Sequence, residues 1–257
     1  MARQAASAGG VIVSIGGDGT FREVAAGVVG SRAVLGVVPS GSGNGFARAL
    51  GVPRHVEDAV RALLKSNVHR LDVGRVNGEL FFNVAGVGLD ARVASVYAES
   101  QKGGRRGIWP YVGLALREYR RFQPEPVGLV IDDRAIKLAP LMVAIANGPQ
   151  FGAGLRVAPG AVFDDGLFEI ITVESARWWR IAPGVAGMFL GRFPSGFPFA
   201  RYQASKIRLE FSRDQSYHVD GEPRRGRALA VDLIPHGVSI LSPGSDSFAA
   251  PSEGFPA

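Results

Sequence analysis

The chain has 257 residues, of which 46% are hydrophobic and 20% charged, a composition typical of a globular protein with one large domain or two small ones. It contains no cysteine, which excludes disulfides and thiolate chemistry. No apolar run approaches the ~18 residues needed to span a bilayer, and the first ten residues show no signal-peptide core. The net charge of +6 suits anionic partners such as phosphates or acidic lipid headgroups. No basic run is interleaved with aromatic residues, so nucleic acid is not expected as a partner.

A glycine-rich loop follows the first buried strand that the sequence predicts. The apolar run Val11–Ile15 predicts that strand, and a helix is expected to open near Val24. Three glycines in the loop Gly16–Thr20 admit positive φ angles, so backbone N–H groups and the helix N-terminus can face an anion. Asp18 suits a phosphate only if Mg²⁺ or a reacting hydroxyl lies between them. A glycine-rich turn capped by Asp18 and Thr20 explains the same pattern without a ligand.

A second loop repeats this arrangement after another apolar run, Val34–Val38. The loop Pro39–Gly51 contains small residues and glycines before a helix expected near Phe46. Two successive strand–loop–helix units place both loops at the same edge of a parallel sheet, where open α/β folds bind ligands. Neither loop matches the Walker P-loop or the dinucleotide-binding glycine fingerprint.

The predicted elements change character along the chain. Residues 1–66 alternate strands and helices and predict an α/β domain. Residues 67–242 are rich in short strands and predict a β-sandwich domain, interrupted by helical insertions near 89–122 and 175–190. The tail 243–257 is rich in Pro, Ser and Gly and is expected to be disordered.

The first domain shows only two parallel strands, too few to stand alone. Three explanations stay open: a truncated chain or misassigned start, a later strand that completes the sheet, or a strand from another chain. One strand is expected at 135–145, and the last strands are expected at 206–211 and 228–235.

Five motifs in order resemble the diacylglycerol kinase catalytic-domain family, which includes sphingosine kinases, ceramide kinases and bacterial lipid kinases. The first motif alone is also similar to NAD kinases and phosphofructokinases, so the series carries the resemblance. It implies that residues 1–66 form a nucleotide-binding, Rossmann-like α/β domain of the NAD kinase and phosphofructokinase kind, and that residues 67–242 form a β-sandwich domain for the lipid acceptor. The motifs are Gly16–Thr20 with Glu23, Pro39–Gly51, Asn83–Ala91, Asn147 with Phe151–Gly154 and Pro159–Leu167, and Val219–Pro223.

The resemblance implies an ATP-dependent lipid kinase that uses Mg²⁺ and transfers the γ-phosphate to a lipid hydroxyl, diacylglycerol-like or sphingoid. Asp18 matches the position that engages Mg-ATP or activates the acceptor hydroxyl, and Glu222 matches the proposed general base. A solvated β-turn at Asp220–Gly221 explains the second position equally well from its local pattern. The residues implied to bind the nucleotide are Gly16, Gly17, Asp18, Gly19, Thr20, Glu23, Gly41, Ser42 and Asn44.

The resemblance also implies a structural Mg²⁺ away from the chemistry. Asp165 would be its side-chain ligand, with the carbonyl oxygens of Val162 and Leu167, and such hard oxygen ligands suit Mg²⁺. A simple turn before the next strand is the alternative interpretation of Asp164–Leu167. The four histidines are scattered without metal-ligand spacing, and we assign them no role.

The sequence departs from the family pattern at several points. Gly45 stands where many diacylglycerol kinases have Asp, one glycine of the usual run is replaced at Gly152–Gly154, and the family's N-terminal strand–helix–strand segment is missing. The missing segment and Gly45 favour an alternative function, a catalytically impaired relative that binds lipid or nucleotide.

A cytoplasmic enzyme of lipid metabolism that touches the membrane peripherally is the expected setting, and a homodimer is left open. Arg177–Arg180 and Met188–Phe193 combine aromatic residues with cations, as interfacial segments do. Core packing of an insertion helix is the alternative, and we favour it on the sequence alone.

Overall fold

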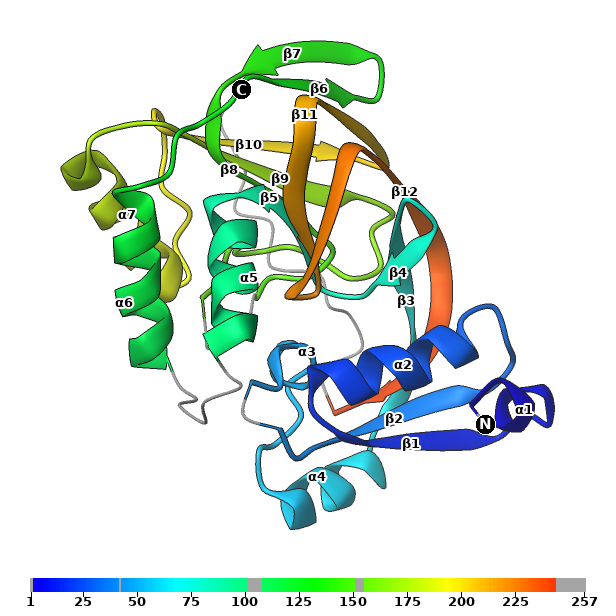
Figure 1. The fold of residues 1–257 in the computed structure, drawn as a ribbon. Coiled ribbons are helices and arrows are strands. Elements are labelled where there is room, and N and C mark those ends of the chain that lie inside the picture. The colour runs from blue at the N-terminus through cyan, green and yellow to red at the C-terminus, as the bar shows by residue number, and fades with distance from the viewer. Residues whose placement is uncertain (1, 42, 101–107, 151–154, 244–257) are drawn as a thin grey trace.

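A computed structural model describes residues 2–41, 43–100, 108–150 and 155–243 (Figure 1). An α/β unit at the N-terminus is joined to a larger unit of antiparallel strands. The helices are α1 (Ala2–Ser7), α2 (Asp18–Val28), α3 (Gly45–Ala49), α4 (Val56–Leu63), α5 (Leu89–Ser100), α6 (Ile108–Tyr119) and α7 (Trp178–Phe189). The strands are β1 (Val11–Gly16), β2 (Val34–Pro39), β3 (Asn67–Val76), β4 (Glu79–Phe81), β5 (Val84–Gly88), β6 (Val127–Ile131), β7 (Arg134–Leu138), β8 (Pro140–Ala146), β9 (Phe168–Glu174), β10 (Phe199–Ala204), β11 (Lys206–Val219) and β12 (Glu222–Ser242).

The N-terminal unit is built on the parallel pair β1 and β2, with Val11 opposite Val34 and Gly16 opposite Pro39. Helix α2 packs on both strands and α4 packs on β2, on opposite faces of the pair (Figure 1). Strand β2 is buried on both faces, as its continuous apolar run predicts. Both glycine loops therefore start from the same edge of a parallel sheet.

A late strand enlarges this two-stranded sheet. The C-terminal end of β12 pairs in parallel with β2, with Ser239 opposite Val34 and Ile240 opposite Leu35. The same strand pairs antiparallel with β3 between Val231 and Ser242, and Figure 1 shows it running from the larger unit into the smaller one. Of the three explanations for the small sheet, a later strand that joins it is confirmed.

The larger unit is the expected β-sandwich, with helical insertions α5, α6 and α7. The strand expected at 135–145 is two strands, β7 and β8, paired to different neighbours. Strand β10 was not predicted, and β11 and β12 are 14 and 21 residues long, longer than expected. Residues 101–107 of the first helical insertion and the motif Phe151–Gly154 lie outside the described residues, as does almost all of the predicted tail.

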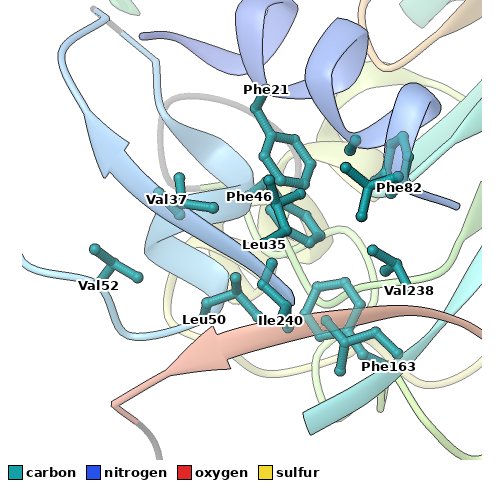
Figure 2. Close-up of a cluster of buried hydrophobic side chains, with 14 of the residues drawn as sticks. Phe21, Leu35, Val37, Phe46, Leu50, Val52, Phe82, Phe163, Val238 and Ile240 are labelled. Carbon is teal, nitrogen blue, oxygen red and sulfur yellow. The ribbon is translucent and has the colours of Figure 1, made fainter. Parts of the chain in front are cut away.

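A cluster of aromatic side chains packs between α2 and α3 (Figure 2). Phe21 of α2 stacks on Phe46 of α3 with 4.2 Å between ring centroids, and Phe82 and Phe163 meet Phe46 edge-on. Ile240 of β12 belongs to the same buried cluster. Elements far apart in the sequence therefore fix α2 and α3 through one apolar core, which positions the loops that precede them.

Candidate active site

The two glycine loops touch each other at the carboxyl ends of β1 and β2. A Cβ on Gly41 would lie 2.6 Å from the Cα of Gly17, and the Ser40 N–H donates to the Gly16 carbonyl at 2.9 Å. A Cβ on Gly16 would collide with Thr20 at 2.6 Å. Glycine is therefore needed for this close approach. Gly17 is also the N-cap of α2, and among the described residues no side chain caps it, so this helix end suits an anionic ligand.

Replacing Gly41 by Ala should destabilise the protein by about 1–3 kcal/mol, because the new methyl group would press on backbone atoms of the first loop. Gly17→Ala is the matched control: its Cβ would lie 3.4 Å from the Cα of Gly41, an ordinary contact. Urea denaturation of both variants would measure the difference in free energy of unfolding. An equal cost in both variants would contradict the close contact between the loops.

Asp18 joins the first loop to the second. Its Oδ2 accepts a hydrogen bond from the Gly45 N–H at 3.0 Å, and its Oδ1 accepts one from the Phe46 N–H at 3.1 Å. Asn44, which lies between the loop and α3 with φ 51°, accepts from the Gly41 N–H and donates to the Gly41 carbonyl. The Asp18 carboxylate is thus held at the start of α3. One of the two N–H groups that bind it belongs to Gly45, the position at which this chain departs from the family pattern.

The hairpin between β11 and β12 carries the second predicted catalytic carboxylate. Asp220, with φ 48°, accepts hydrogen bonds from the backbone N–H groups of Phe82, Asn83 and Val84 at 2.8, 2.9 and 3.0 Å. The tight turn expected there is present, and it is anchored to the start of β5. Glu222 follows, and its Oε1 lies 4.0 Å from the point that a Cβ on Gly19 would occupy. The hairpin therefore places Glu222 beside the first turn of α2.

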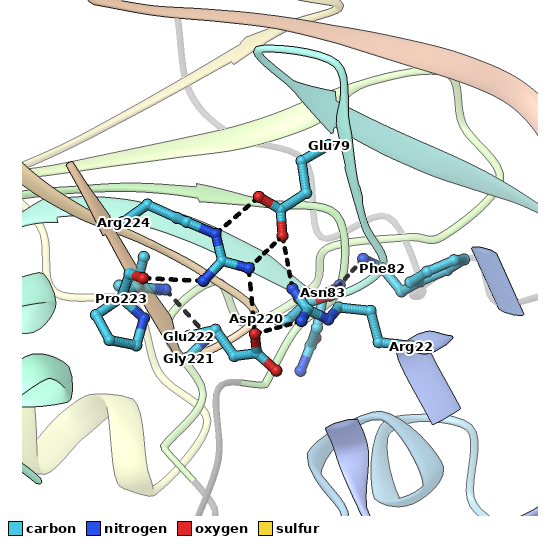
Figure 3. Close-up of polar contacts among 10 residues, drawn as sticks. Arg22, Glu79, Phe82, Asn83, Asp220, Gly221, Glu222, Pro223 and Arg224 are labelled. Atoms are coloured by element: carbon cyan, nitrogen blue, oxygen red, sulfur yellow. Dashed lines mark hydrogen bonds and ion pairs between the residues drawn. The ribbon is translucent and has the colours of Figure 1, made fainter. Parts of the chain in front are cut away.

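Glu222 belongs to a network of two acidic and two basic side chains (Figure 3). Arg22 pairs with Glu222 and, at 2.9 Å, with Glu79. Arg224 donates to both Glu79 oxygens at 2.9 and 2.7 Å and to Glu222 at 3.2 Å. The hydrogen bond to Glu79, and more weakly that to Glu222, raises the pKa of Arg224. The alternative interpretation from the sequence was a Glu222 side chain surrounded only by solvent. In the structure Glu222 is instead paired with two cations, Arg22 and Arg224.

The titration of Asp220 gives a test of its surroundings. Burial raises the pKa of Asp220, while the N–H groups of Phe82, Val84 and Asn83 and the charge of Arg22 oppose that rise. The unfolded carboxyl group loses its proton near pH 3.9, before the folded one does. Between the unfolded pKa and the folded pKa, the folded state binds more protons than the unfolded state. The free energy of unfolding therefore falls as the pH rises from about 4 to the folded pKa.

Asp220→Asn cannot titrate, so the stability difference between wild type and this variant should shrink as the pH rises from about 4. Urea denaturation of both proteins across this pH range would measure the difference. A difference that grows with pH would mean that the hydrogen bonds outweigh burial and that the pKa is lowered.

The other predicted nucleotide residues lie on the two loops and on α2. Thr20 and Glu23 lie exposed on the first turns of α2. Gly16, Gly17, Gly19 and the pair Gly41 and Asn44 form the facing loops already described. Ser42 lies outside the described residues. Their assignment to the nucleotide stays a prediction.

The predicted structural Mg²⁺ loop is held by a buried acid that the sequence did not single out. Asp72 accepts hydrogen bonds from the Gly166 N–H and the His236 N–H, both at 2.7 Å. Asp165 accepts from the Leu167 N–H at 3.0 Å. Burial raises the pKa of Asp165, and the charges of nearby acidic groups, Asp72 among them, add to the rise.

The donor chemistry of this loop fits a hard cation, because the exposed Asp165 carboxylate stands beside further acidic groups. Among the described residues, no three or more His, Cys, Asp and Glu side chains gather in a metal-binding arrangement. A cation here would thus rely on Asp165 and on backbone carbonyls, the donor set that the resemblance implies. The site stays a prediction.

One buried pair was missed, because no role was assigned to histidine. The His218 Nε2 lies 3.0 Å from the Asp90 Oδ2, and the His218 Nδ1 accepts from the Gly221 N–H at 3.3 Å. A Cβ on Gly86 would lie 2.2 Å from that Asp90 oxygen. Gly86 and Asp90 both belong to the motif Asn83–Ala91. Their spacing in that motif is the sequence signal from which the contact with Asp90 could have been predicted. The pair supports the hairpin that carries Glu222.

Two family models match this chain. The model described as the diacylglycerol kinase catalytic domain matches residues 1–76, and the model described as the YegS C-terminal NAD kinase beta sandwich-like domain matches residues 83–242. A protein of Chromohalobacter salexigens named "Probable lipid kinase YegS-like" is 30% identical over 95% of this chain and 79% of its own length. The chain belongs to the YegS-like diacylglycerol kinase family.

Further comparisons agree with membership of the YegS-like family. A protein of the same name from Pseudomonas aeruginosa strain PAO1 is 31% identical over 90% of this chain and 76% of its own length. The crystal structure of a diacylglycerol kinase from Bacillus anthracis strain Sterne aligns with a TM-score of 0.71 at 21% identity, covering 93% of this chain and 79% of that one. The structural likeness supports the fold of the YegS-like family: a mixed α/β unit followed by a β-sandwich.

Proposed function

We propose that the protein is an ATP-dependent lipid kinase that transfers the γ-phosphate of ATP to a lipid hydroxyl, diacylglycerol-like or sphingoid. The observation that carries this proposal is the position of Glu222, whose Oε1 lies 4.0 Å from the point that a Cβ on Gly19 would occupy. A carboxylate from the sandwich domain thus faces the glycine loop of the α/β domain, which is where a hydroxyl and a phosphate would have to meet.

Phosphoryl transfer needs positioned phosphates, neutralised charge and a base near the attacking hydroxyl. The glycine loops and the N-terminus of α2 would hold the phosphates, and Arg22 and Arg224 lie close enough to Glu222 to balance charge there. The Mg²⁺ that accompanies ATP would neutralise phosphate charge, and Asp18 of the first loop would hold it in place.

Glu222 would take the proton of the acceptor hydroxyl as its oxygen forms a bond to the γ-phosphorus. The bond between that phosphorus and the bridging oxygen of ADP breaks in the same reaction, which leaves ADP and a lipid phosphate.

The identity of the acceptor is the open part of the proposal. The N–H of Gly45 donates to Asp18. Residue 45 carries no carboxylate here, whereas many diacylglycerol kinases have Asp at this position. We therefore include sphingoid bases as acceptors. A substrate that resides in a bilayer also implies peripheral contact with the membrane. Among the described residues, no helix is long and apolar enough to span a bilayer.

The test is transfer of labelled γ-phosphate from ATP with Mg²⁺ to diacylglycerols and sphingoid bases in mixed micelles. We expect label in one lipid class, and that class names the acceptor. Binding of ATP with no labelled lipid from either class would favour the alternative function, a relative that binds nucleotide or lipid without transfer.

A further inference from the structure

The segment around α7 exposes large apolar side chains together with arginines. Trp178 and Leu190 are 62% and 76% exposed, while Ile181 and Met188 of the same helix are buried against the sandwich. The helix is therefore apolar on the face that packs and on the face that meets solvent, which is unusual in water. The other large exposed apolar side chains of this segment are Trp179, Phe189 and Phe197.

The structure corrects the interpretation that we favoured from the sequence. Core packing explains Ile181 and Met188, but it does not explain the tryptophans that precede them. Tyr119 at the end of α6 donates to the carbonyl of Ala176 at 2.6 Å. This hydrogen bond joins the segment before α7 to α6. It therefore helps to hold the exposed side chains of α7 in place.

Cations lie among these aromatic side chains. The guanidinium carbons of Arg177 and Arg180 lie 5.0 Å from the ring centroid of Trp179 and 5.9 Å from that of Phe197, respectively. These four side chains, with Ser175 and Ala176, line a cavity of about 420 Å³. The segment 175–197 holds three arginines and no acidic residue. The surface is thus both apolar and positively charged.

We propose that segment 175–197, here called the α7 surface, docks the protein on a bilayer that contains anionic phospholipid. Tryptophan beside arginine is the composition of protein segments that lie at the membrane interface, and positive charge attracts anionic headgroups. A second copy of the chain fits less well, because a symmetric contact would bring the same arginines together. The biological sense of this inference rests on the proposed lipid substrate, but its test does not require catalysis.

The test is sedimentation of the purified full chain with vesicles of phosphatidylcholine alone or with about 30% phosphatidylglycerol, in about 0.1 M salt. The wild type should bind the anionic vesicles at least about ten-fold more tightly. Trp178→Ser with Leu190→Ser, and separately Arg177→Gln with Arg180→Gln, should each reduce that binding at least about ten-fold.

Matched controls come from the opposite end of the molecule. Leu64→Ser removes a side chain of the same kind that is 83% exposed beyond α4, and Arg61→Gln with Arg70→Gln removes two exposed arginines. Both controls should bind vesicles as the wild type does. All these residues are exposed, and circular dichroism with thermal melting would verify that each variant is folded.

Several results would overturn the inference: no binding of the wild type to either vesicle, equal binding to both, or an equal loss in the controls. A dimer that the Trp178→Ser and Leu190→Ser change disrupts, with no vesicle binding, would assign the surface to a second copy instead. Vesicle binding without phosphoryl transfer would retain the docking surface and reject the proposed function. Phosphorylation of a dispersed short-chain acceptor without vesicle binding would do the reverse.

Discussion

Glu222→Gln should lower the rate of phosphoryl transfer about 10²- to 10⁴-fold, the usual contribution of a general base. The side chain keeps its size but loses the charge that accepts the hydroxyl proton. The fold should survive, because the Glu222 side chain is 43% exposed and the turn before it is held by Asp220. Steady-state transfer from labelled ATP, with the circular dichroism spectrum unchanged, is the measurement.

Glu79→Gln is the matched control for this change. Glu79 pairs with the same two arginines as Glu222, so its replacement disturbs the network by one charge in the same way. It lies on β4, and the carboxylate beside Gly19 remains in place. We expect a loss below about ten-fold. Equal losses in the two variants would mean that the network, rather than the Glu222 carboxylate, supports transfer.

Asp220→Ala should lower the free energy of unfolding by about 3 kcal/mol or more. Three backbone N–H groups lose their acceptor, and each buried donor left unpaired costs about 1–3 kcal/mol. The residue also has φ 48°, a conformation that alanine adopts only with strain. Urea denaturation at neutral pH would measure the loss.

Asp132→Ala separates these two causes. Asp132 also has φ 48°, but it lies exposed in the turn between β6 and β7. Its replacement therefore imposes the backbone strain alone, about 1 kcal/mol. If Asp220→Ala cost no more than Asp132→Ala, the hydrogen bonds to the start of β5 would contribute little, and the proposed anchoring of the hairpin would be wrong.

Features with a local signature could be predicted from the sequence. The strands at Val11 and Val34 and the glycine loops after them follow from apolar runs bounded by glycine, and the structure confirms the loops at one sheet edge. The resemblance supplied Asp18 and Glu222 as candidates. Their placement around α2 depends on tertiary packing, which no single stretch of sequence encodes.

The ion-pair network shows why the rest could not be predicted. Glu79 lies 57 positions from Arg22 and 145 from Arg224, and charged residues at such separations have no recognisable pattern. The strand predicted at 228–235 is shorter than β12. The pairing of β12 with β3 shifts register between Ile234 and Val238, and such a shift breaks the alternation of apolar and polar residues that marks a strand. Strand β10 is half-exposed along most of its length, so its apolar signal is weak.

We propose that the two glycine loops and the Glu222 hairpin together form the nucleotide and phosphoryl-transfer site. Amide hydrogen exchange with and without ATP and Mg²⁺ tests this site most directly. We expect slower exchange at Gly17–Thr20 and at the start of α3, and no change in the distant hairpin of β6 and β7. Protection confined to other segments, or none at saturating ATP, would contradict this site.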